Sequence, residues 1–188
     1  SLTPGISMDG SGFTRTGETV LHRGHVITLS IATFSGPSGE VIERDVVHHP
    51  GAVAVVPVDG DEVVLVRQYR PVLEREMLEI PAGKLDVPGE DRLEAARREL
   101  VEEAGVDAPH LIELCRFHNS IGFCDELTTI YLATELVPGE PKAVSVEEEY
   151  LSVERVSLAD VEGLIDDGTI TDAKTVIGLL RALNYLDR

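Results

Sequence analysis

Three glutamates in the middle of the chain have the residue type and the spacing that metal chemistry needs. Glu99, Glu102 and Glu103 stand at positions i, i+3 and i+4, which places them on one face of a helix, about one turn apart. Like charges at this spacing repel each other, so a purely structural helix would avoid them. Clustered carboxylate oxygens suit a hard divalent ion, and Mg2+ is commonly held by a few carboxylates together with waters and substrate phosphates. The pattern therefore predicts a metal site that serves a phosphate-containing substrate.

The stretch around these glutamates, GKLDVPGEDRLEAARRELVEEAGV from Gly83 to Val106, resembles the Nudix box, the signature of the Nudix hydrolase family. From Glu90 onward the spacing matches the family pattern at every position. Six residues separate Gly83 from Glu90, one more than the pattern has. The extra residue falls in a loop with Pro88-Gly89, which indicates a turn ahead of the helix. The spacing inside the helix is intact, so the box is favoured over the alternative of a solvated acidic helix face.

The box helix also has its own start and stop signals. Asp91 is a suitable N-cap with Glu94 three residues later, and Gly105 can adopt the left-handed conformation that ends a helix. Arg98 is expected to point away from the acidic face and to pair with Glu90, which would fix the preceding loop. The residues expected to form the buried stripe of the helix are Leu93, Ala96, Leu100 and Ala104.

Four flanking motifs are similar to those of the ADP-ribose pyrophosphatase branch of the family. They are Arg67-Gln68-Tyr69-Arg70, Glu79-Ile80-Pro81-Ala82-Gly83, Ser120 to Glu126, and Ile170 to Thr175. The β-rich segment that opens the chain is similar too, and in that branch it forms a small separate domain that helps to build a dimer. One departure is Ser120-Ile121-Gly122, where the branch usually has Ser-Pro-Gly. The resemblance therefore implies the type of reaction more firmly than the identity of the substrate.

The resemblance implies a metal site in the box. Glu99 and Glu103 would be direct ligands, Glu102 would bind directly or through water, and the carbonyl of Ala82 would be a further ligand. Mg2+ is the expected ion, with Mn2+ as the alternative. Such ions would neutralise the charge of a pyrophosphate, activate a water and stabilise the leaving phosphate.

The general base comes, in this branch, from a loop after the box. The acidic run at residues 147–149 stands in the matching place, and the alignment favours Glu147, with Glu149 as the alternative and a solvated charge run as the structural explanation. Glu102 and Arg98 complete the predicted catalytic set.

The predicted substrate contacts lie in the flanking motifs. The guanidinium of Arg70 suits a phosphate or adenine stacking, and Glu79 can meet ribose hydroxyls or a metal-bound water. Either residue could instead belong to a structural ion pair. Gly122 and Glu126, from the third flanking motif, are also assigned to the substrate.

The chain up to residue 48 is expected to be β-rich. Glu18 to Phe34 forms one long strand-like run, Gly36 to Gly39 a turn, and Glu40 to Val47 a second strand. Two or three strands need a packing partner, and apolar positions in this segment, Val20 and Ile27 among them, lack one. We therefore expect residues 1–48 to form a homodimer contact and residues 49–188 to form the catalytic domain.

The catalytic part mixes strands and helices. Strands are expected at 53–58 and 62–69, joined by an Asp59-Gly60 hairpin, and again at 127–136 and 150–156. Ser157 can cap a helix to about residue 167, and Thr171 can cap a final helix over 172–186. This order predicts an α/β fold, an α/β/α sandwich with a mixed sheet, which is also the fold that the Nudix resemblance implies.

Composition limits the partners. The formal net charge is −18, with 34 acidic and 16 basic residues among 188, which argues against nucleic acid or an anionic membrane. No run of 18 apolar residues is present, so no membrane span is expected. Cys115 and Cys124 are expected to be reduced thiols of a cytoplasmic protein. The adjacent His48 and His49 point to opposite faces of a strand, which favours structural roles over a metal pair.

The resemblance implies hydrolysis of ADP-ribose to AMP and ribose 5-phosphate. Another nucleoside diphosphate sugar or a dinucleotide is the alternative substrate. A sensor that binds ADP-ribose without cleaving it is disfavoured, because such modules typically lose box carboxylates and this box has lost none. A structural calcium-binding domain is excluded by spacing, because the chain has no Asp-x-Asp-x-Asp-Gly loop.

Overall fold

The computed structural model describes residues 10–139 and 150–187, which group into two compact units. The N-terminal unit comprises the chain up to Pro50 together with the segment His118–Glu126. The C-terminal unit comprises Gly51–Phe117 and the chain from Leu127 onward. The chain therefore passes between the units at three places. The division into a dimerising segment at 1–48 and a catalytic domain at 49–188 stays a prediction.

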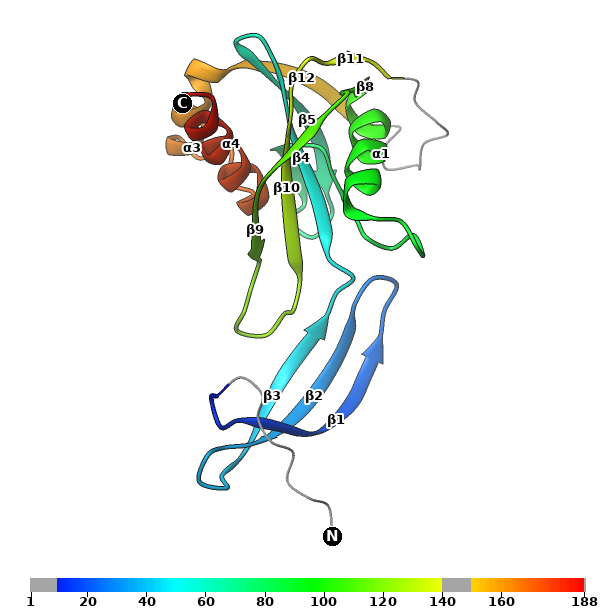
Figure 1. The fold of residues 1–188 in the computed structure, drawn as a ribbon, viewed down its shortest axis with the longest axis vertical. Helices are drawn as coiled ribbons and strands as arrows, with labels where there is room; N and C mark the ends of the chain where they lie inside the picture. The colour runs from blue at the N-terminus through cyan, green and yellow to red at the C-terminus, as the bar shows by residue number, and fades with distance from the viewer. Residues whose placement is uncertain (1–9, 140–149, 188) are drawn as a thin grey trace. The chain divides into compact units, whose positions relative to one another are not determined.

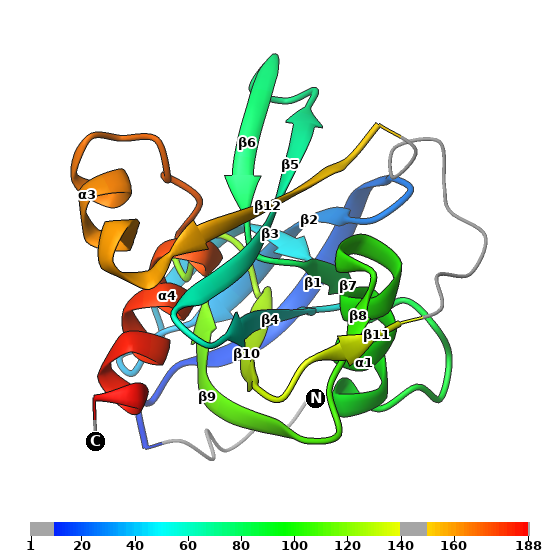
Figure 2. The ribbon, with the colours of Figure 1, turned by 90° about the horizontal axis from the view of Figure 1, so that it is seen from above.

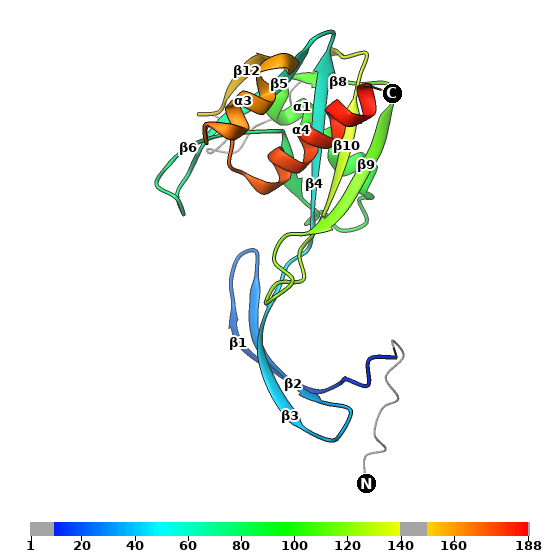
Figure 3. The same cartoon turned by 90° about the vertical axis from the view of Figure 1, so that its left-hand side faces the viewer.

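The N-terminal unit is built on a curved three-stranded antiparallel sheet (Figure 3), made of β1 (Thr14–Arg23), β2 (Thr28–Ser35) and β3 (Val41–His48). The single long run expected from Glu18 to Phe34 is wrong, because the chain reverses between β1 and β2. There the amide of Gly24 donates to the carbonyl of Ile27 over 2.8 Å. A strand-like composition continues through this turn, so the pattern alone does not reveal it.

The C-terminal unit is built on a seven-stranded mixed sheet. Its core order is β12-β5-β4-β10-β9, with β6 paired to β5 and β7 paired to β4. The strand β4 runs parallel to β10 and antiparallel to β5, and Gly60 turns the β4–β5 hairpin with φ of 64°. The strands are β4 (Ala52–Asp59), β5 (Glu62–Arg70), β6 (Arg75–Glu79), β7 (Ala82–Lys84), β9 (Leu111–His118), β10 (Leu127–Ala133) and β12 (Ser152–Ser157).

Helices cover both faces of this sheet (Figures 1 and 2). The helix α1 (Arg92–Ala104) lies on one face, and α3 (Val161–Asp166) and α4 (Ala173–Leu186) lie on the other. Two apolar cores result, one around Leu100 of α1 and one around Leu179 of α4. The strand β4 is buried at every position from Ala52 to Val58, as expected for a strand covered on both faces. The predicted α/β/α sandwich with a mixed sheet is confirmed.

Smaller elements complete the C-terminal unit. A short 3-10 turn, η1 (Leu158–Asp160), is capped by the hydroxyl of Ser157 as expected. The final helix is capped by Asp172, one residue after the predicted Thr171. A two-stranded ribbon of β8 (Val106–Asp107) and β11 (Val137–Pro138) was not expected. None of the helices in the described residues is both long and apolar enough to cross a lipid bilayer.

Candidate active site

The helix α1 begins and ends where its sequence predicts. The Asp91 carboxylate accepts hydrogen bonds from the backbone amides of Leu93 and Glu94, at 2.8 and 2.9 Å. Gly105 ends the helix in the left-handed region with φ of 66°. One member of the expected buried stripe is wrong: Leu93 is 44% exposed, and Ala95 packs against the sheet in its place. The buried face of α1 includes Ala95, Glu99 and Glu103, so it is rotated away from Leu93.

Two of the three box glutamates are buried. Glu99 and Glu103 are each 8% exposed, and Glu102 is partly exposed. An oxygen of Glu103 accepts a hydrogen bond from the amide of Ala82 at 2.9 Å, which ties α1 to β7. Glu99 lies directly against Gly83, where an added Cβ would stand 1.9 Å from the Glu99 carboxylate. The Ala82-Gly83 step is therefore the surface on which the buried carboxylates of α1 rest.

The electrostatics of this pair favour a bound cation. Burial raises the pKa of Glu103 to about 8, and the neighbouring charge of Glu99 pushes it in the same direction. The amide of Ala82 only partly offsets these effects. A divalent ion would supply the missing positive charge, and the available donors are hard carboxylate and carbonyl oxygens. The residues present therefore fit a hard divalent cation of the Mg2+ type.

Arg98 joins the loop before the helix to the acidic face. Its Nε and Nη2 donate to the two oxygens of Glu90 at 2.9 and 3.0 Å, which confirms the predicted pair. Its Nη1 donates to Glu99 at 2.7 Å and to Glu102 at 2.9 Å. The expectation that Arg98 points away from the acidic face is therefore wrong.

Nη1 of Arg98 lies between two of the glutamates. Within the described parts of the chain, no group of three or more His, Cys, Asp or Glu side chains is arranged to hold a metal ion. An ion at this face would take over charge that Arg98 now supplies to Glu99 and Glu102. The bond from Arg98 to Glu90 involves other nitrogens, so it does not depend on that exchange.

A second charged cluster lies at the ends of β5 and β6. Arg70 donates to both oxygens of Glu79, from Nε at 2.7 Å and from Nη2 at 2.8 Å. Lys174 of α4 donates to the same carboxylate at 2.6 Å. Burial alone would raise the pKa of Glu79, but Arg70 and Lys174 lower it to about 2. The two predicted substrate residues thus form the ion pair that the sequence analysis left open.

The two clusters are electrostatic neighbours. The charges of Arg70 and Glu79 both act on the pKa of Glu103, although they are secondary to burial and the backbone bond. The side chain of Arg70 is 39% exposed, and its Nη1 donates to no atom of the described residues. One terminal nitrogen of this arginine is therefore available to a ligand beside the box.

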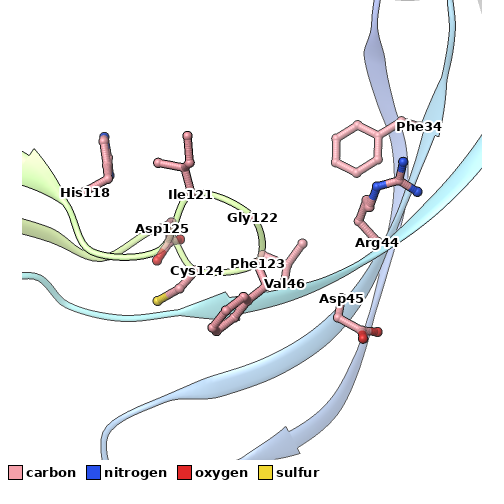
Figure 4. Close-up of a pocket in the computed structure, with 10 residues that line it drawn as sticks. All are labelled: Phe34, Arg44, Asp45, Val46, His118, Ile121, Gly122, Phe123, Cys124 and Asp125. Carbon is pink, nitrogen blue, oxygen red and sulfur yellow. The ribbon is translucent and has the colours of Figure 1, made fainter.

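Two predicted substrate residues, Gly122 and Glu126, belong to the N-terminal unit. Gly122 lines a pocket of about 350 Å3 in that unit. Figure 4 shows the loop that carries Ile121 and Phe123 on one side of this pocket and Phe34 of β2 on the other. Glu126 lies 3.7 Å from Nδ1 of His49. Contact of either residue with a substrate stays a prediction.

The remaining predicted residues either belong to the box or lie outside the described residues. Ala82, Arg98 and the three box glutamates gather around one end of β7. The two candidates for the general base, Glu147 and Glu149, lie outside the described residues. Sequence reasoning quoted Lys174 in a motif but gave it no role. A lysine in the first turn of a helix is unusual, because the helix dipole disfavours a cation there, and that signal could have singled it out.

Comparison with known families decides what kind of protein carries this site. The family of the NUDIX domain matches residues 47–177. The chain belongs to the NUDIX family. This membership confirms the predicted family and the predicted fold class.

Several curated relatives of this NUDIX protein align over most of its length. ADP-ribose pyrophosphatase of Bacillus subtilis is 41% identical, over 87% of this chain and 86% of the relative. Methanol dehydrogenase activator of Bacillus methanolicus is 38% identical over the same shares. ADP-ribose pyrophosphatase of Mycobacterium tuberculosis is 36% identical, over 85% of this chain and 78% of the relative.

A solved structure shares the fold. The crystal structure of an ADP compounds hydrolase superposes with a TM-score of 0.81 at 26% identity. The match covers 93% of this chain and 94% of that one. It therefore includes both units of the chain.

Proposed function

We propose that this protein hydrolyses the pyrophosphate bond of ADP-ribose to AMP and ribose 5-phosphate with the help of a divalent cation, Mg2+ in the first place and Mn2+ as the alternative. The observation that carries the proposal is the complete set of box carboxylates, with Glu99 and Glu103 buried against the Ala82-Gly83 step. The relatives named ADP-ribose pyrophosphatase support the choice of substrate.

The residues that would hold the cation are Glu99, Glu102 and Glu103, together with the carbonyl of Ala82. A bound ion of this type neutralises pyrophosphate charge and makes a water more acidic. The work of Arg98 is to fix the loop through Glu90 and to orient Glu99 and Glu102. The two parallel bonds from Arg98 to Glu90 fix the loop whether or not an ion is bound, whereas the bonds from Nη1 place Glu99 and Glu102 before an ion arrives.

The substrate side of the site is built on Arg70. Its Nε and Nη2 are bound to Glu79, which leaves Nη1 to donate to a phosphate oxygen or a ribose hydroxyl. The attacking water then has to lose a proton to a base. We assign that role to Glu147, with Glu149 as the alternative, from their place in the sequence after the box.

A broader substrate range is the second candidate. The structural relative is described as an ADP compounds hydrolase, and the relative from Bacillus methanolicus is named a methanol dehydrogenase activator. Not every relative is therefore named for ADP-ribose. Nucleoside diphosphate sugars and dinucleotides share the pyrophosphate that the carboxylate face would serve. A non-cleaving sensor of ADP-ribose is disfavoured, because the box carboxylates are all present.

We also propose a homodimer and a cytoplasmic location. In the N-terminal unit Val20 and Leu21 of β1 are 42 and 54% exposed, and Ile27 of the following turn is 39% exposed; a second copy of the chain would cover them. The location is supported by Cys115 and Cys124, which are both free thiols. The net charge of −18 argues against nucleic acid and anionic membranes as partners.

The decisive experiment is a turnover screen of the purified protein. ADP-ribose, other nucleoside diphosphate sugars and dinucleotides are incubated with Mg2+, with Mn2+ or with a chelator, and the products are separated by chromatography. We expect AMP and ribose 5-phosphate from ADP-ribose, at the highest kcat/KM, and no product in chelator. If another pyrophosphate compound is preferred, that compound replaces ADP-ribose as the proposed substrate. If no compound is cleaved, the proposed hydrolase activity is overturned.

A further inference from the structure

Lys174 occupies a position that helix electrostatics disfavour. It is the second residue of α4, two residues after the cap Asp172, where the free backbone amides already carry partial positive charge. Its Nζ lies 2.9 Å from Asp172 and 2.6 Å from Glu79, and its side chain is only 15% exposed. The two carboxylates therefore stabilise a cation that the helix alone would repel.

The first turns of α4 are fixed to the end of β6 at this point. The hydroxyl of Thr175 accepts a hydrogen bond from the amide of Ile80 at 3.1 Å. Gly178, one turn after Lys174, packs so tightly that an added Cβ would stand 2.9 Å from the side chain of Ile80. Because Ile80 follows Glu79, these contacts hold Lys174 in register with the Glu79 carboxylate.

The charge balance of the cluster depends on this lysine. Arg70 and Lys174 carry two positive charges, and Glu79 and Asp172 carry two negative charges, so the four side chains are neutral together. Without Lys174 the cluster would carry one net negative charge beside the acidic face of α1. A negative cluster would hold Arg70 more strongly and would repel an anionic phosphate.

We propose that Lys174 is a positioning residue, which neutralises Glu79 so that Arg70 can present its Nη1 to the anionic diphosphate of the substrate. The inference rests on the proposed hydrolysis and deepens it. Lys174 acts through Glu79 and Arg70 and does not itself touch the substrate. Its loss should therefore weaken substrate binding more than it slows the chemical step.

The test compares Lys174→Met with Lys174→Arg and with Arg181→Met. The last variant removes a cation from an exposed position of the same helix and serves as the matched control. We expect Lys174→Met to raise KM for ADP-ribose about tenfold, the scale of a hydrogen bond to a charged group, with kcat nearly unchanged. Lys174→Arg should restore most of the affinity, and Arg181→Met should match wild type.

A binding measurement without turnover separates this inference from the proposed function. Calorimetry in chelator with the non-hydrolysable methylene analogue of ADP-ribose should show the same loss of affinity for Lys174→Met. If wild type cleaves no pyrophosphate at all, the proposed function fails. If wild type cleaves ADP-ribose and Lys174→Met behaves like Arg181→Met in both assays, the positioning role fails.

A double mutant tests whether the effect passes through Arg70. In an Arg70→Met background, adding Lys174→Met should cause little further rise in KM. The same tenfold rise in that background would overturn the proposal. If thermal melting shows that Lys174→Met does not fold, Lys174→Gln keeps a donor to Glu79 without the charge. A KM for Lys174→Gln equal to that of Lys174→Arg would then contradict the role of the charge.

Discussion

Gly83 and Glu99 are in direct contact across the junction of β7 and α1. The carboxylate of Glu99 fills the space in which any side chain at position 83 would begin. An ideal Cβ on residue 83 would lie 1.9 Å from the carboxylate carbon of Glu99. This contact gives a packing reason for the glycine that opens the box. The carboxylate that is proposed to bind the metal ion is placed by the absence of a side chain on the facing strand.

Gly83→Ala should therefore damage catalysis more than folding. The methyl group would push the Glu99 carboxylate aside, and a displacement of about 1 Å in an active site can cost about a hundredfold in rate. Turnover of ADP-ribose and thermal melting would be measured together. The control is Gly163→Ala in α3, where an added Cβ meets nothing within 4 Å, and which should be neutral or slightly stabilising. Equal turnover in the two variants would contradict the steric argument.

Glu103→Gln should lower turnover by about two to four orders of magnitude, the range in which metal and acid–base groups usually act. The amide keeps the size of the side chain and removes a charge that burial disfavours, so the protein should fold and melt at or above the wild-type temperature. Turnover is measured at saturating Mg2+. Near-normal turnover there would remove Glu103 from the metal site.

Glu147→Gln should lower kcat strongly and leave the affinity for metal and substrate nearly unchanged, the pattern of an interaction made mainly in the transition state. The single variants at 147, 148 and 149 are compared at one Mg2+ concentration. If the Glu149 variant loses activity and the Glu147 variant keeps it, the general base is Glu149. Full activity in all three variants would move the base elsewhere, with Glu102 and Glu126 as the next candidates.

The stability of the N-terminal unit should depend on the protonation of His48. Nδ1 of His48 lies 2.6 Å from Asp125 and Nε2 lies 2.5 Å from Glu18, and these carboxylates raise its pKa above 6.5. A raised pKa means that the stabilisation is fully present below the unfolded value and is lost as pH rises through the folded value. Thermal melting of wild type should therefore show this loss above about pH 6.5.

His48→Gln should remove that part of the pH dependence, and His110→Gln, an exposed histidine of the other unit, should retain it. Asp125 and Glu18 determine how the stability depends on pH in the acidic range, because the pKa values of both carboxylates are lowered. Their contribution is lost as pH falls through the folded values. Parallel melting curves for wild type and His48→Gln across neutral pH would contradict the prediction.

Val20→Glu should convert the proposed dimer to a monomer. A charge in the centre of a buried apolar contact is strongly unfavourable, and Val20 is 42% exposed on the N-terminal sheet. Sedimentation at micromolar concentration gives the mass. Val137→Glu on β11, at a valine of the other unit that is 48% exposed, should leave the mass unchanged. A monomeric wild-type protein would end the proposal.

The parts of the site that follow from local rules were predictable from the sequence. The cap of α1 and the placement of Glu99 and Glu103 on one face need only the helical repeat. Leu93 was misplaced because the helical repeat does not say how the helix is rotated against the sheet, and here the buried face includes Ala95, Glu99 and Glu103. The hydrogen bonds from Nη1 of Arg98 to Glu99 and Glu102 were not predicted, because they depend on the rotamer of a long side chain. The ion pairs of Glu79 could not be predicted in full, because they depend on the packing of α4. That helix brings Lys174 to Glu79 from 95 residues away in the chain.

The passage of the chain through both units limits how the protein can be divided. The segment His118–Glu126 leaves the C-terminal unit after β9 and pairs with β3, where the amide of Val47 donates to the carbonyl of Phe123 at 2.7 Å. A gene fragment that starts after Pro50 would still encode this segment but would lack its partner strand. A protease cut at the same place would leave two pieces that still share hydrogen bonds. The N-terminal sheet can therefore be exchanged between related proteins only together with the segment His118–Glu126.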